Sequence, residues 1–66
     1  MRFRAEVHRA YTRDLTLDLG EWGSKREAEF TCFSHMNQLL VWEERSFGFW
    51  QARTERHWYQ IVVVQD

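Results

Sequence analysis

The closing third of the sequence carries large apolar side chains on both faces of what its pattern predicts to be two β-strands. Side chains alternate along a strand, so Phe49 and Trp50 point to opposite faces in the first of them, and Trp58 and Tyr59 do so in the second. A chain of 66 residues has material to cover only one face of such a sheet. We therefore expect the second face to meet a second copy of the chain or a target.

The rest of the chain predicts two further strands. Residues 3–11 and 14–19 alternate between apolar and polar side chains, and residues 11–14 can make the turn between them. This pattern indicates a hairpin with one apolar face, where Leu15, Leu17 and Leu19 lie together, and one charged face. The closing strands are expected over residues 47–53 and 57–65, joined by a short loop.

Residues 24–27 read Ser-Lys-Arg-Glu, which is the pattern of a capping box and predicts a helix that starts at Ser24. One apolar stripe of this helix should lie on the sheet, and Phe30, Phe33 and Val41 fall off that stripe. The stripe consists of Ala28, Cys32, Met36, Leu39 and Leu40. Residues 39–45 fit either the end of the helix or a strand. The sequence thus predicts a single α+β domain over residues 1–66, with the order ββαββ and one helix packed on one face of an antiparallel sheet.

Composition limits the classes of function. The chain has one cysteine, which fits a reducing compartment, and it shows neither a membrane-spanning run nor a signal peptide, so we expect a cytoplasmic protein. Nine basic and ten acidic residues give a net charge of −1, which disfavours nucleic acid as the sole partner. Eight of the nine basic residues are arginines, and arginine suits protein interfaces better than lysine does.

No pattern in the sequence indicates an enzyme or a cofactor. Cys32 and His35 have a helical spacing that lets both reach one metal ion, but two ligands do not make a site and no further ligand completes it. Cys32 also lies within the apolar stripe, where a free cysteine ordinarily packs as a small hydrophobic residue. We expect no catalytic residues and no metal.

The aromatic residues of the closing strands have two functional interpretations. They could stack nucleic-acid bases with help from nearby arginines, or they could anchor a protein interface. The neutral charge balance favours the protein interface. The predicted open face of the sheet carries Arg2, Arg4, Phe49, Arg53, Tyr59 and Ile61. If the alternation is inverted, Trp50 and Trp58 take their place.

In size and architecture the chain resembles the very small cytoplasmic proteins, encoded by bacteriophages or plasmids, that block a host machine by binding it. Anti-CRISPR proteins and phage inhibitors of host polymerase belong to this loose group. Three segments carry the resemblance: the strand that starts at Met1-Arg2-Phe3, the entry to a single helix over residues 22–29, and the aromatic closing hairpin that ends in residues 61–66. The resemblance implies an inhibitor that works by occlusion, and it implies no site residues.

Together these observations predict a non-enzymatic protein that binds a protein or ribonucleoprotein complex and occludes it, with a CRISPR effector as one such target. Two alternatives stay open, a nucleic-acid-binding protein and a homodimeric structural or regulatory protein.

Overall fold

The computed structural model describes residues 1–64 and has six elements of regular structure. They are β1 (Arg2–Arg9), β2 (Leu15–Trp22), α1 (Lys25–Met36), β3 (Glu43–Ser46), β4 (Phe49–Arg53) and β5 (His57–Val64). The predicted α+β class is confirmed, but the order is ββαβββ, with one strand more than the sequence predicts. Gln65, the last residue of the expected closing strand, and Asp66 lie outside the described residues.

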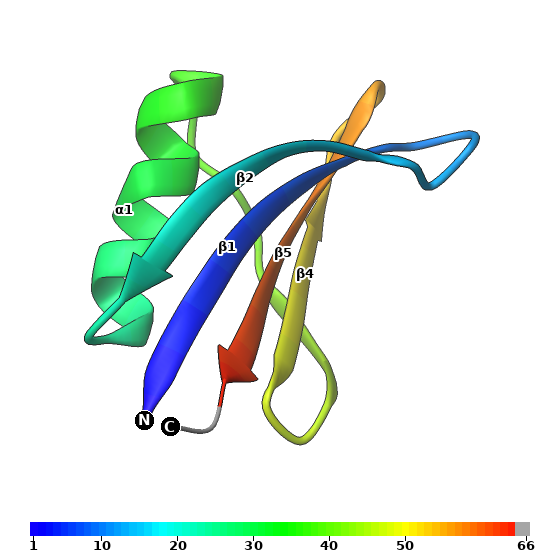
Figure 1. The fold of residues 1–66 in the computed structure, drawn as a ribbon. Helices are drawn as coiled ribbons and strands as arrows, with labels where there is room; N and C mark the ends of the chain where they lie inside the picture. Colours follow the sequence, from blue (N-terminus) through cyan, green and yellow to red (C-terminus); the bar gives the residue numbers. More distant parts are fainter. Residues whose placement is uncertain (65–66) are drawn as a thin grey trace.

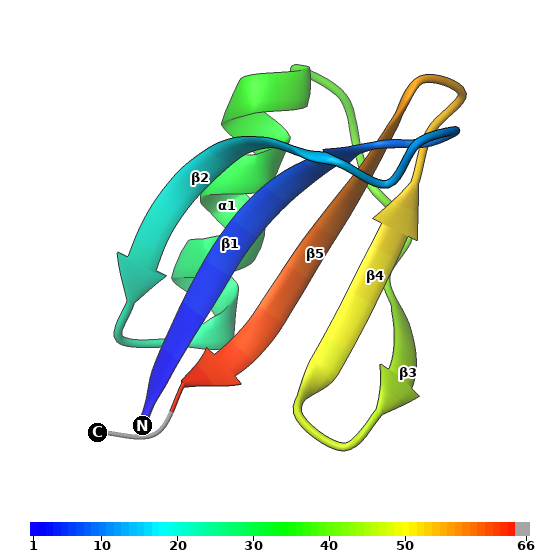
Figure 2. The ribbon, with the colours of Figure 1, turned by 45° about the vertical axis from the view of Figure 1, so that its right-hand side comes forward.

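The five strands form one antiparallel sheet in the order β2-β1-β5-β4-β3, and α1 lies across one face of it (Figure 1). At its centre, β1 and β5 pair over eight consecutive residue pairs, from Arg2 opposite Val64 to Arg9 opposite His57. The turn between β1 and β2 and the turn between β4 and β5 lie side by side at one end of this sheet (Figure 2).

The first hairpin is confirmed, but its apolar residues do not all share a face. Two register shifts interrupt the pairing of β1 with β2, and Gly20, which has a φ of 96°, lies at the first of them. This backbone conformation suits glycine because other residues rarely adopt it. The second shift pairs Leu17 with Val7 but Leu15 with His8, so the prediction of one continuous apolar face is wrong.

The helix begins where the capping box predicts. The Glu27 backbone N–H donates to Ser24 Oγ at 3.2 Å, and the Ser24 hydroxyl donates to Glu27 Oε1 at 3.2 Å. The helix ends at Met36, because Asn37 adopts the left-handed conformation and its N–H bonds the Phe33 carbonyl. The extension of the apolar stripe to Leu39 is therefore wrong, and Leu39 is exposed.

The core lies between α1 and the sheet. Ala28 and Cys32 are the two buried residues of the helix, and their small side chains let it approach the strands closely. The sheet supplies the other buried apolar residues, which are Ala5, Val7, Ala52, Tyr59 and Ile61. Half-buried aromatic side chains, including Phe3, Trp22, Trp42 and Trp50, pack against this cluster. Within residues 1–64, no helix is long and apolar enough to cross a membrane.

Candidate binding surfaces

The open face of the sheet, which α1 leaves uncovered, is defined by the pairing of its strands. Residues that pair directly point to the same side of a sheet. Ala5, Ile61 and Trp50 form one cross-strand row, and because the first two are buried in the core, this row faces the helix. The next row is Arg4, Val62 and Phe49, so these side chains point away from the helix. The same alternation places Arg2 and Arg53 on the open face, as predicted.

Tyr59 and Ile61 lie on the opposite side, and the prediction that they belong to the open face is wrong. Both have no solvent exposure and contribute to the core. The reason is register: Phe49 pairs with Val62 rather than with Ile61. The inverted alternative is half right, since Trp58 pairs with Arg53 on the open face while Trp50 faces the helix.

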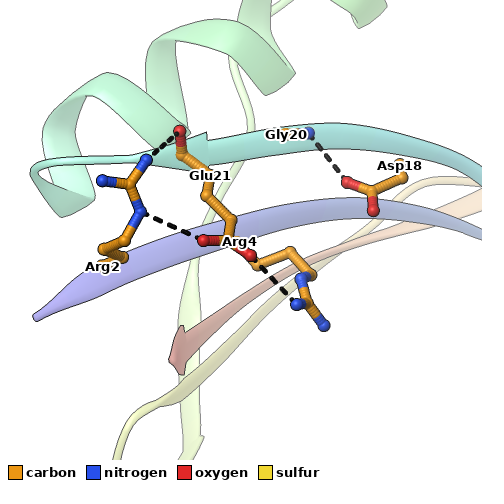
Figure 3. Close-up of polar contacts among 5 residues, drawn as sticks. All are labelled: Arg2, Arg4, Asp18, Gly20 and Glu21. Carbon is orange, nitrogen blue, oxygen red and sulfur yellow. Dashed lines mark hydrogen bonds and ion pairs between the residues drawn. The ribbon is translucent and has the colours of Figure 1, made fainter. Parts of the chain in front are cut away.

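Arg2 and Arg4 are held by one carboxylate on the open face (Figure 3). Arg2 Nε and Arg4 Nη2 each lie 3.0 Å from a different oxygen of Glu21, on the neighbouring strand β2. The hydrogen bonds from Arg4 and Arg2 lower the pKa of Glu21, and the bond to Glu21 raises the pKa of Arg4. Near them, the Gly20 N–H donates to Asp18 Oδ1 at 2.8 Å. These two arginines are thus already paired within the chain.

The middle of the open face is polar. Glu6, Gln60 and Gln51 form a row across β1, β5 and β4, with Asp18 and Glu43 paired at its two edges. A row of carboxylates and amides gives bases nothing to stack on. The sheet surface therefore lacks the central aromatic platform that single-strand binders of the sheet type use.

A second surface, the helix–loop patch, consists of Phe30, Phe33 and Leu39 on the outer side of α1 and the loop that follows it. These side chains are 67%, 37% and 84% exposed, respectively. The rings of Phe30 and Phe33 lie 6.3 Å apart, and a shallow groove of about 240 Å³ runs between these rings and Leu39. The off-stripe positions of Phe30 and Phe33 are visible in the sequence, whereas Val41, which the sequence predicts on the same helix face, lies in the loop beyond the helix end at Met36. The exposure of Leu39 is not visible in the sequence, because it depends on where the helix ends.

The spacing of Cys32 and His35 does not produce a metal or nucleophile site. Cys32 is fully buried, and burial raises the pKa of its thiol to about 12. His35 instead turns to Tyr59, with its Nδ1 2.7 Å from the hydroxyl oxygen. Across the described residues 1–64, no three His, Cys, Asp or Glu side chains come together as a metal site would require.

Comparison with protein-family models, with curated proteins and with solved structures returned no match. The arrangement itself offers two kinds of contact: an apolar patch on the helix side, and charged groups on and around the open face.

Proposed function

We propose that this chain is a non-enzymatic binding protein that occludes a surface of a protein or ribonucleoprotein complex. The observation that carries the proposal is the helix–loop patch. It gathers two aromatic side chains and one aliphatic side chain that the core does not use. Clustered apolar exposure of this kind marks interaction sites on small proteins.

The energetics suit an interface anchor. Moving one large apolar side chain from water into a fitted contact contributes about 1.5–3 kcal/mol, so three of them are a substantial driving force for association. Arg26 borders the groove beside Phe30 and has no carboxylate partner among the described residues. An arginine at the rim of an apolar centre is the arrangement that many protein interfaces share.

The target class rests on the resemblance to small phage- and plasmid-encoded inhibitors, which occlude host machines without chemistry of their own. A host complex, a CRISPR effector among them, is therefore the first target to test. The reducing cytoplasm, where such complexes work, also suits a chain whose one cysteine is unpaired.

A binding assay with matched variants tests the proposal. The tagged protein is mixed with purified CRISPR effector complex, with and without nuclease and across a range of salt concentrations, and the dissociation constant is measured. The double variant Phe30→Ser/Leu39→Ser should weaken binding at least about a hundredfold, because it removes two apolar anchors. Phe47→Ser is the control, since Phe47 is 97% exposed but lies in the distant turn between β3 and β4.

Equal affinity of the wild type and the double variant would contradict the role of the patch. Failure to bind any such complex, together with a melting temperature that rises with protein concentration, would favour the homodimer instead. Sedimentation of the double variant as a monomer would then place the dimer contact at this patch.

A further inference from the structure

Four arginines collect at one end of the sheet, around the two turns that lie side by side in Figure 2. Arg9 ends β1 and Arg13 lies in the turn that follows it, while Arg53 ends β4 and Arg56 lies in the turn before β5. The two turns are joined, because the Ala10 N–H donates to the Arg56 carbonyl at 3.1 Å. All four arginine side chains are exposed. We call this set the arginine end.

None of the arginines of this end has a carboxylate partner, and among the other arginines of the described residues only Arg26 shares this feature. Arg2, Arg4 and Arg45 each pair with a glutamate, whereas none of the four at the arginine end forms an ion pair within residues 1–64. Residues 9–14 and 53–57 hold these four arginines against two carboxylates, Asp14 and Glu55, which is a local charge of +2. Although the net charge is −1, the charge is therefore unevenly distributed, with a positive region at this end of the sheet.

Two of the four guanidinium groups are held in place before any ligand arrives. Arg13 and Arg53 lie over the ring of Trp58, with guanidinium carbons 5.4 Å and 4.7 Å from the ring centroid. Arg53 Nε also donates to Gln51 Oε1 at 2.9 Å, and His8 Nδ1 lies 3.1 Å from the Arg13 carbonyl oxygen. A guanidinium packed against an aromatic ring still has N–H groups to offer an anion, and less side-chain entropy remains to be lost on binding.

An exposed aromatic ring accompanies these charges. Tyr11 lies in the turn between Arg9 and Arg13, and it is 89% exposed. Single-stranded nucleic acid is bound by this combination, in which cations contact the phosphates and aromatic or guanidinium planes stack on the bases. The carboxylates of the neighbouring open face would repel a long duplex laid across the sheet, whereas a short single strand can stay on the two turns.

We propose that the arginine end binds the phosphate backbone of single-stranded nucleic acid, with Tyr11 stacking on a base. This inference does not depend on the helix–loop patch. A ribonucleoprotein target would engage both surfaces at once, and a pure protein target would engage the patch alone.

Fluorescence anisotropy with a labelled oligothymidylate of about ten nucleotides tests the inference. The variant Arg13→Gln/Arg53→Gln should weaken binding at least about tenfold. The control Arg2→Gln/Arg4→Gln changes the net charge equally, but these arginines already pair with Glu21, so affinity should stay within about twofold. If all four arginines of this end contact phosphates, a plot of the logarithm of the association constant against the logarithm of the salt concentration should have a slope of roughly −3.

The inference would be overturned if the oligothymidylate did not bind at about 50 mM salt, or if both double variants weakened its binding equally. Equally tight binding of oligoglutamate would also overturn it and would assign the site to an acidic protein. Tyr11→Ala separates nucleic acid from phosphate alone. It should weaken oligothymidylate binding at least about fivefold and leave binding of inorganic polyphosphate unchanged, whereas no effect on either would overturn the nucleic-acid assignment. Arg9→Gln/Arg56→Gln provides a second test should the first variant not fold.

Discussion

His35 Nδ1 lies 2.7 Å from the hydroxyl oxygen of Tyr59, and this contact joins the last turn of α1 to the first half of β5. The Tyr59 ring is fully buried, and its hydroxyl also lies 3.5 Å from Met36 Sδ. Burial raises the pKa of Tyr59, with a further contribution from Cys32, so the hydroxyl stays protonated well into the alkaline range. The helix is therefore attached to the sheet by a polar contact as well as by apolar packing.

Tyr59→Phe should lower the free energy of unfolding by about 1 kcal/mol, because it removes this hydrogen bond while His35 keeps access to water. Tyr59→Ala should cost about 3–5 kcal/mol, since it also leaves a cavity in the core. Urea denaturation measures both. If the contact carries the effect, Tyr59→Phe made in a His35→Ala background should cost clearly less than it does alone.

Lowering the pH should weaken the ion pairs that join β1 to β2. The folded protein holds the pKa of Glu21 below its ordinary value of 4.5, so its ion pairs stabilise the fold above that pH and are lost as pH falls through the lowered folded value. When the pH is lowered from about 6 to about 3, the melting temperature of Glu21→Gln should therefore fall less than that of the wild type. Parallel pH profiles of the two proteins would count against the pairing.

Local patterns in the sequence are enough to predict most elements of this fold. The first hairpin follows from alternation, the helix start from Ser24 and Glu27, and the closing hairpin from two β-rich segments around a short loop. Each of these signals depends on residues close together in the chain. β3 lacks such a signal because Glu43–Ser46 is a short edge strand whose four residues are all exposed, so it has no apolar alternation.

The candidate site depends on which residues far apart in the sequence pair or pack together, and the sequence alone does not predict this. Alternation shows that Phe49 and Trp50 face opposite ways, but a shift of one residue between β4 and β5 decides which of them shares a face with Tyr59. The arginine end is hidden for the same reason, because Arg13 and Arg53 meet only through the packing of two turns on Trp58.

Cys32 should be protected from alkylation while the protein is folded. Its side chain is fully buried, and its pKa of about 12 leaves almost no thiolate near pH 8, the form that reacts. Iodoacetamide labelling followed by mass spectrometry should show a rate that rises with urea concentration in step with unfolding. Rapid labelling without denaturant would mean that the helix detaches from the sheet.

The raised pKa of Cys32 also implies that the free energy of unfolding declines as pH rises above the ordinary thiol value of 9.0.

The capping box gives a final prediction with an internal control. In Ser24→Ala the Glu27 N–H loses its acceptor and Glu27 Oε1 loses its donor, so the free energy of unfolding should fall by about 1 kcal/mol. Ser34→Ala makes the same chemical change on the exposed side of the same helix, where alanine is the better helix former, and should leave stability equal or slightly higher. Thermal unfolding followed by circular dichroism compares the two. An equal loss of stability in both variants would show that the hydroxyl of Ser24 contributes nothing specific to the start of α1. Unchanged stability in Ser24→Ala would show that the cap is dispensable, because tertiary packing alone then holds the first turn in place.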